Sequence, residues 1–140
     1  MAGSKKFRPE NSREAALFIL DRVENGGAYA DILLQEVLEA LDVRERPLTT
    51  ELVYGVLRYR LRLDWIIGNF SKIKTAKLET KVLNALRLGV YQLCLLDGIP
   101  ASAAVDEAVK LVKKGDAKRA GFVNAILRAV TAEKDGITYP

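Results

Sequence analysis

The sequence predicts an all-α protein, a bundle of about six to seven helices, and three observations support this. Apolar residues recur at intervals of three and four along most of the chain, and no stretch alternates with a period of two. The segment 78–96 is apolar around most of its helical circumference, which is typical of a helix that other helices surround. With 140 residues, 49% of them hydrophobic, the chain is long enough to bury a core as one domain.

The first part of the chain predicts a basic arm followed by two amphipathic helices. We expect residues 1–10 to form a flexible arm. Asn11 fits the N-cap of the first helix, and Glu14 three positions later completes a capping box. That helix should end at the glycine pair 26–27, because glycine readily adopts the left-handed conformation of a helix C-terminus. A second helix is predicted over about 29–41.

A long helical pattern extends from 45 to 70. Pro47 suits its first turn, where the missing N–H needs no partner. Because the pattern is longer than a typical globular helix, we expect a break within 59–62. Gly55 lies inside the first half, where glycine costs about 1 kcal/mol relative to alanine, so we expect another helix to pack closely against it.

A polar connector at 71–77 divides the chain into two helical halves, and the apolar segment 78–96 follows it. The polar stripe of that segment, which includes Arg87 and Tyr91, is the only part of it for which we expect a surface role. Cys94, the single cysteine, lies among apolar residues and is expected to pack rather than react.

Two more helices are predicted, over 102–114 and 117–132. The last of them begins with Lys118 and Arg119, whose charges oppose the helix dipole, so a reason other than helix stability is needed for them. The final residues, 135–140, are expected to be extended and to start a linker to a C-terminal domain that is missing from this chain.

The residue types needed for common active sites are missing. The chain has no histidine, no paired Cys/His metal spacing and no glycine-rich phosphate loop, so we expect neither an enzyme nor a metal site. No apolar run reaches the ~18 residues of a membrane span, and the basic N-terminus lacks the apolar region of a secretory signal. These features favour a cytoplasmic protein.

Several motifs together resemble a known family. They are TTELVYGVLRYRLRLDWII, VLNALRLGVYQLCLLDGIPASAAVDEAVKLVKK and GFVNAILR. The resemblance covers about residues 13–131 and is to the N-terminal domain of bacterial small-subunit ribosomal RNA (cytosine-5)-methyltransferases, within the NusB-like family of RNA-binding folds. It implies a two-lobed helical domain over 11–134 that recognises the RNA substrate. It also implies that S-adenosylmethionine and the catalytic cysteines belong to a further C-terminal domain, so that this chain holds no cofactor.

Other interpretations remain open. The chain also resembles the transcription antitermination factor NusB, which binds boxA RNA together with a ribosomal protein. Against that alternative, the segment 116–119 is more basic than in those factors, and Arg128 stands where they usually carry an acid. A protein-interaction domain should expose an apolar groove, and no apolar stripe is left over in the helical pattern. A helical scaffold without a binding role is the plainest alternative.

Basic residues supply the candidate RNA-binding surface. The net charge is only +4, so the distribution of the cations matters more than their sum. We expect the arm, the start of the first helix and the start of the last helix to form one RNA-facing surface, which the connector extends. The candidate residues are Lys5, Lys6, Arg8, Arg13, Lys72, Lys74, Lys118, Arg119 and Arg128. The expected partner is ribosomal RNA, with no membrane, and the chain is expected to be a monomer or a weak dimer.

Overall fold

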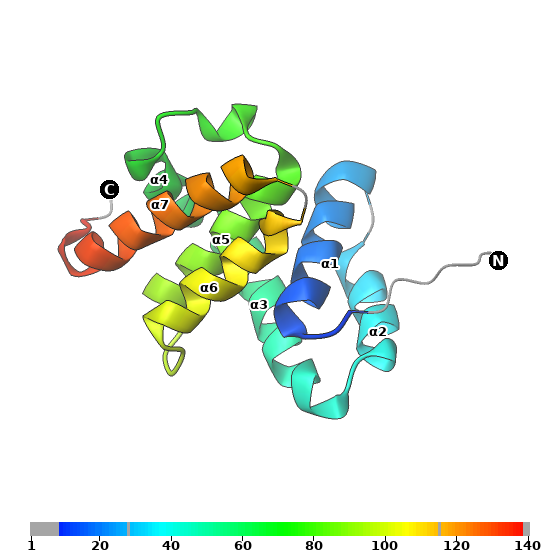
Figure 1. The fold of residues 1–140 in the computed structure, drawn as a ribbon. Coiled ribbons are helices and arrows are strands. Elements are labelled where there is room, and N and C mark those ends of the chain that lie inside the picture. Colours follow the sequence, from blue (N-terminus) through cyan, green and yellow to red (C-terminus); the bar gives the residue numbers. More distant parts are fainter. Residues whose placement is uncertain (1–8, 28, 115, 139–140) are drawn as a thin grey trace.

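The computed structural model describes residues 9–27, 29–114 and 116–138, and it confirms the predicted all-α fold (Figure 1). Over these residues the chain forms seven α-helices, three short 3₁₀ turns and no strand. The helices are α1 (Ser12–Gly26), α2 (Ala30–Ala40), α3 (Arg46–Arg58), α4 (Arg60–Phe70), α5 (Thr80–Cys94), α6 (Ala101–Lys113) and α7 (Ala117–Glu133). The 3₁₀ turns are η1 (Val43–Glu45), η2 (Thr75–Lys77) and η3 (Lys134–Gly136).

Side-chain capping fixes the start of α1, as the sequence predicts. Asn11 is extended, and its Oδ1 accepts a hydrogen bond from the Glu14 N–H at 2.9 Å. The return bond reaches one residue further back than in a standard capping box, since Glu14 Oε1 accepts from the Glu10 N–H at 3.2 Å. Gly27 has a φ of 65° and ends the helix in the left-handed conformation that glycine permits.

The long pattern from 45 to 70 is two helices, and the predicted break is confirmed at Tyr59, which has a φ of −105° and a ψ of 17°. Pro47 lies in the first turn of α3. The close approach predicted at Gly55 is also confirmed, because a Cβ built there would lie 2.1 Å from Tyr91 Cζ. Gly55 therefore marks the place where α3 crosses α5.

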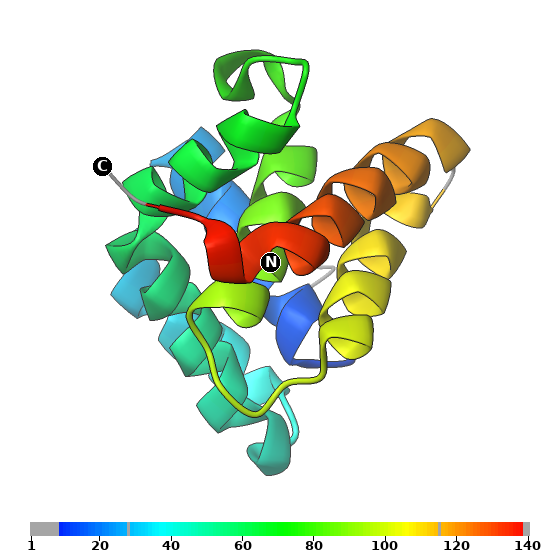
Figure 2. The same ribbon diagram turned by 90° about the vertical axis from the view of Figure 1, so that its left-hand side faces the viewer.

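The helix α5 occupies the centre of the molecule, and the other helices surround it (Figures 1 and 2). It is shorter than the predicted segment 78–96, because Glu79 and Leu95 adopt the non-helical dihedral angles of its two caps. Eleven of its 15 residues are buried. It packs against α1, α3, α4, α6 and α7, so it belongs to the core of both halves of the chain.

The C-terminal part of the described chain differs from the predicted extended segment. Residues Lys134–Gly136 form the turn η3, and the Ile137 N–H donates to the Lys134 carbonyl at 3.4 Å. Ile137 packs against the hydrophobic core, and this apolar contact explains why the chain turns back. The prediction of extended chain from residue 135 is therefore wrong at the turn.

Apolar side chains are left exposed on α4, contrary to the prediction that no apolar stripe is left over. On α4, Leu63, Ile66 and Ile67 are fully buried and fill the side that faces α5. Leu61 and Trp65 fall on the other side of the same helix and remain 82% and 37% exposed. The sequence pattern accounted for the buried face of α4 but not for these two side chains.

Candidate nucleic-acid interface

The start of α7 carries two of the predicted cations next to an acid that caps the helix. Asp116 Oδ1 accepts hydrogen bonds from the Lys118 N–H at 2.9 Å and from the Arg119 N–H at 3.2 Å. This carboxylate supplies the negative charge that a helix N-terminus favours, so the helix tolerates the neighbouring cations. The Lys118 side chain is exposed beside it.

Arg119 has two acidic partners, so it is not an isolated surface cation. Its Nε lies 2.9 Å from Glu79 Oε1, its Nη2 also donates to Glu79, and Asp116 Oδ2 lies 3.4 Å from its Nε. The side chains of Arg119 and Glu79 are 34% and 58% exposed. A pair this exposed contributes at most about 1 kcal/mol, so Arg119 could exchange Glu79 for another anion at small cost.

The start of α1 is tied to the C-terminal half of α5. Arg13 is half-buried, and its Nε donates to Gln92 Oε1 at 2.9 Å. The Gln92 amide in turn donates to the Leu88 carbonyl at 2.8 Å. Ser12 is 1% exposed, and its hydroxyl donates to Glu45. Ser12 and Arg13 therefore stabilise the packing of the start of α1 against η1 and α5.

The two groups of predicted cations lie at opposite ends of α5. Arg13 contacts Gln92, whereas Arg119 contacts Glu79 at the N-cap, and the 13 residues between positions 79 and 92 span about 20 Å of helix. Figures 1 and 2 both show the start of α1 toward the lower side of the molecule and the start of α7 toward the upper side. An RNA strand that contacts both must therefore extend along the protein.

A polar groove of about 620 Å³ lies between α1 and α6. Its charged lining residues are mixed in sign: Glu10, Glu14, Asp21 and Glu107 with Lys81, Lys110 and Lys114. Phe18, Leu17 and Leu111 add apolar surface. The lysines could contact phosphates there, whereas the four carboxylates would repel them, so the groove is not a purely cationic channel.

The remaining predicted cations are dispersed. Lys72 and Lys74 are exposed on the connector, and Arg128 is exposed on α7 with its Nε 3.3 Å from Asn124 Oδ1. Lys5, Lys6 and Arg8 lie outside the described residues. A role of these side chains in RNA binding stays a prediction.

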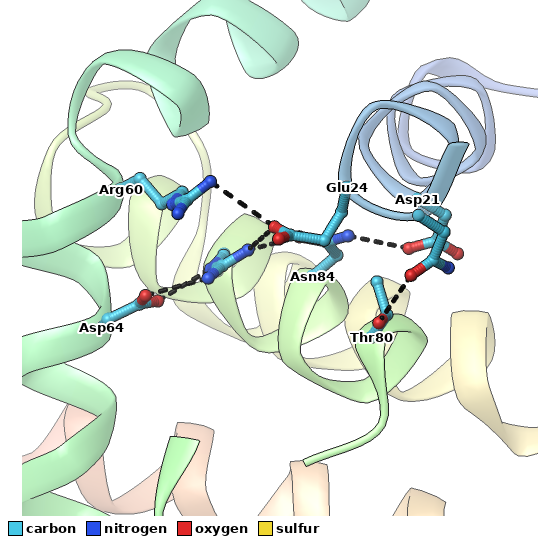
Figure 3. A network of polar contacts seen from close by, with 8 residues as sticks. Asp21, Glu24, Arg60, Asp64, Thr80 and Asn84 are labelled. Atoms are coloured by element: carbon cyan, nitrogen blue, oxygen red, sulfur yellow. Dashed lines mark hydrogen bonds and ion pairs between the residues drawn. The ribbon is translucent and has the colours of Figure 1, made fainter. Parts of the chain in front are cut away.

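The part of the α5 polar stripe that carries Arg87 and Tyr91 is buried, so the prediction of a surface role for these two residues is wrong. Arg87 is 4% exposed, and its Nε and Nη2 donate to the two carboxylate oxygens of Asp64 at 2.7 and 2.8 Å. Its Nη1 donates to Glu24 Oε1 at 3.1 Å and to Asn84 Oδ1 at 2.9 Å. Figure 3 shows Asp64, Glu24 and Asn84 converging from α4, α1 and α5 on this guanidinium.

Further polar contacts extend this cluster along α1. Asn84 Nδ2 donates to Asp21 Oδ1 at 2.8 Å, and Arg60 Nη1 lies 3.6 Å from Glu24 Oε1 (Figure 3). Burial disfavours the charge on Arg87, but the hydrogen bonds that it donates to Asp64 and Glu24, and the charges of these acids, outweigh this, so its pKa is raised. Burial also raises the pKa of Asp21, although the Asn84 hydrogen bond opposes the shift. The cluster thus stabilises the junction of α1, α4 and α5.

The sequence contains a signal for this cluster. Arg87 is a cation on a helix that is otherwise apolar nearly all round, and such a position can be buried only if acids neutralise it. Tyr91 follows the same pattern, since its hydroxyl donates to Glu51 and burial raises its pKa to about 12. Both side chains join helices inside the fold and are not available to an external ligand.

Within the described ranges, no cluster of three His, Cys, Asp or Glu side chains could hold a metal ion. Cys94 is half-buried, and burial raises the pKa of its thiol, which makes it a poor nucleophile. None of the described helices is both long enough and apolar enough to cross a membrane.

Comparisons with known sequences agree with this fold. The chain matches the NusB family over residues 10–132. The probable ribosomal RNA small subunit methyltransferase B of Bacillus subtilis is 39% identical over 124 residues, which make up 86% of this chain and 28% of that protein. The transcription antitermination protein NusB of Geobacillus kaustophilus is 32% identical over 128 residues, which make up 90% of this chain and 97% of that protein. The chain thus spans less than a third of the methyltransferase.

Solved structures show the same arrangement of helices. A chain in the crystal structure of antitermination factors NusB and NusE in complex with dsRNA matches with a TM-score of 0.78 and 30% identity, over 86% of this chain and 93% of that chain. NusB from T. maritima matches with a TM-score of 0.78 and 25% identity, over 87% of this chain and 89% of that chain. The helical bundle is therefore the fold that these proteins share.

Proposed function

The chain belongs to the NusB family, and from this premise we propose that it is an RNA-binding domain. The observation that carries the proposal is the family match over residues 10–132, because one relative of the same fold was crystallised with RNA. Exposed cations at the start of α7, on the connector and on α7 itself provide contacts for phosphate oxygens.

We propose further that the chain is the N-terminal substrate-recognition module of a small-subunit ribosomal RNA (cytosine-5)-methyltransferase. The identity of 39% to the methyltransferase of Bacillus subtilis, compared with 32% to the antitermination protein of Geobacillus kaustophilus, supports this choice. The basic character of Lys118, Arg119 and Arg128 supports it as well. In this proposal the S-adenosylmethionine site and the catalytic residues belong to another domain of the parent protein, and the present chain contributes RNA binding.

A second candidate function is transcription antitermination. It is supported by coverage, because the chain spans 97% of the antitermination protein of Geobacillus kaustophilus but only 28% of the methyltransferase. An antitermination factor should bind boxA RNA more tightly when the ribosomal protein NusE is present. A methyltransferase module should bind a small-subunit ribosomal RNA fragment without it. Titrating both RNAs with and without NusE distinguishes the two functions.

The salt dependence of binding tests the proposed cationic surface. We expect Lys118→Ala to weaken binding about equally for different RNA sequences and to lower the log–log salt slope by ~0.7, because one phosphate contact on single-stranded RNA is lost. Fluorescence anisotropy of a labelled ribosomal RNA fragment at several salt concentrations measures both quantities. The melting temperature should stay nearly unchanged, since Lys118 is exposed.

Arg44→Ala is the matched control for this experiment. Arg44 is a cation with an 88% exposed side chain in η1, paired with Asp42, and Figure 1 shows η1 at the opposite end of the molecule from the start of α7. Its replacement removes the same charge and should leave the salt slope unchanged. If Lys118→Ala and Arg44→Ala weaken RNA binding equally, the binding depends on the overall charge of the protein and not on the start of α7. The absence of any binding by the unmodified chain would contradict the proposed function itself.

A further inference from the structure

The outer face of α4 combines apolar, aromatic and cationic side chains. Leu61, Arg62 and Trp65 follow one another at helical spacing, and Asn69 continues the row one turn later. Leu61 is 82% exposed, and Trp65, the only tryptophan in the sequence, is 37% exposed. Exposed apolar surface next to polar groups is typical of a binding site.

Trp65 and Asn69 also line a groove of about 560 Å³ between α4 and the end of α7. Figure 2 shows the C-terminal end of α7, continuing into η3, beside α4. Phe70 and Ile137 add half-buried apolar surface to the lining, and Glu133 adds an exposed carboxylate. The groove therefore offers an aromatic ring and polar groups close to one another.

Two side chains of this groove offer hydrogen-bond acceptors. The Asn69 Nδ2 donates to the Trp65 carbonyl at 3.1 Å, which leaves the amide Oδ1 to accept from a ligand. The carboxylate of Glu133 is a second acceptor. Cytosine, adenine and guanine each carry an exocyclic amino group that could donate to such acceptors, whereas uracil has none.

Exposed arginines precede Trp65 along the chain. Arg58 and Arg62 are exposed at the end of α3 and the start of α4, whereas Arg60 between them pairs with Glu24 on α1. The only acid within α4 is Asp64, and its carboxylate is bound to Arg87. Arg62 lies one turn before Trp65 on the same helix, and a nucleic acid strand uses cations for its phosphates and aromatic rings for its bases.

We propose that this groove binds an unpaired nucleobase of single-stranded RNA. The base stacks on the indole of Trp65, its amino edge donates to Asn69 or Glu133, and Arg62 contacts an adjoining phosphate. The inference rests on the proposed RNA-binding function and adds a base-binding site to the phosphate contacts described above. Because Lys118 and Glu133 are 15 residues apart on α7, about 22 Å separates this groove from the start of that helix.

The fluorescence of Trp65 tests the inference directly, because no other tryptophan contributes to the emission. The full chain is titrated with a short oligocytidylate, with an oligouridylate of equal length and with an RNA duplex. We expect saturable quenching by oligocytidylate, weaker quenching by oligouridylate and none by the duplex, whose bases are already stacked. Binding of a labelled strand that leaves the Trp65 emission unchanged would overturn the inference.

Substitutions separate stacking from charge. Trp65→Leu should weaken the binding of single-stranded RNA by about 5- to 100-fold while leaving the salt slope unchanged, because stacking involves no phosphate. Trp65→Phe should keep most of the affinity and also serves as the stacking-competent variant if Trp65→Leu fails to fold. Tyr29→Leu is the matched control, since Tyr29 is a 77% exposed aromatic residue at the N-cap of α2 and its replacement should not affect binding.

The outcomes distinguish this inference from the proposed function. If no RNA binds to the unmodified chain, both fail. A third result would be RNA binding with a strong salt dependence, an unchanged Trp65 emission, and equal RNA affinities of the unmodified chain and Trp65→Leu. In that case the proposed function stands and the nucleobase groove is wrong. If the emission changes with protein concentration in the absence of RNA, the groove is a contact between two copies of the chain, and the inference is also wrong.

Discussion

Arg87 is the single residue whose environment most changes the interpretation of the central helix. It is a buried cation whose guanidinium is bound by Asp64, Glu24 and Asn84, from three different helices. A buried charge is costly unless it is paired and hydrogen-bonded, and here each of the three guanidinium nitrogens donates to an acceptor. Arg87 therefore connects α5, in the second half of the chain, to α1 and α4 in the first half.

We expect Arg87→Ala to lower the free energy of unfolding by roughly 2–4 kcal/mol, because the acids are left without their cation. This loss of stability should be smaller than for a fully buried ion pair, since the side chains of Asp64 and Glu24 are still 23% and 35% exposed. Arg60→Ala is the control: Arg60 is 47% exposed and lies 3.6 Å from the same Glu24, so about 1 kcal/mol or less should be lost. Urea denaturation measures both, and equal losses would contradict the argument.

At the scale of helices, the crossing of α3 and α5 depends on a glycine. A Cβ on Gly55 would lie 2.1 Å from Tyr91 Cζ and 2.3 Å from its Oη, far closer than atoms can approach. The ring cannot move freely, because its hydroxyl donates to Glu51 and it stacks on Tyr59 with centroids 6.4 Å apart. The two helices therefore approach as closely as they do only because position 55 lacks a side chain.

We expect Gly55→Ala to lower the free energy of unfolding by about 1–3 kcal/mol, because the added methyl group overpacks the crossing. Gly121→Ala is the matched control within α7, where an added Cβ meets no atom within 4 Å. That substitution should raise the free energy of unfolding by about 0.5–1 kcal/mol, the usual gain of alanine over glycine in a helix. Thermal denaturation of the two variants checks both signs, and stabilisation by Gly55→Ala would show that the crossing is looser than described.

At the scale of the whole molecule, α5 is shared by both helical halves. The helices α1, α3 and α4 pack against it from the first half, and α6 and α7 from the second. The buried apolar residues of all these helices form one continuous cluster. The connector 71–77 divides the sequence into two parts, but it does not divide the core.

We therefore expect the chain to unfold in one cooperative transition. Far-UV circular dichroism reports helix content in both halves, and the emission of Trp65 reports the surroundings of α4 in the first half. The two melting curves should have the same midpoint, and Gly55→Ala should shift both equally. Two separate transitions, with Trp65 emission following only one of them, would mean that the halves unfold independently.

The sequence by itself determined where the helices lie and how several of them begin and end. The N-cap at Asn11, the break at Tyr59 and the close approach at Gly55 were all predicted and observed. Each follows from rules that act between neighbours in the chain: apolar spacing, capping chemistry and the backbone freedom of glycine. The family resemblance covered the same helices and led to the same fold.

Only the tertiary structure decided which polar side chains are available at the surface. Arg13 bonds to Gln92 across 79 positions, Arg119 to Glu79 across 40, and Arg87 to Asp64 across 23. Sequence patterns locate such residues on a helical face, but they do not show which distant helix covers that face. The burial of Arg87, the pairing of Arg119 and the exposure of Trp65 all depend on helix packing, so local spacing could not predict them.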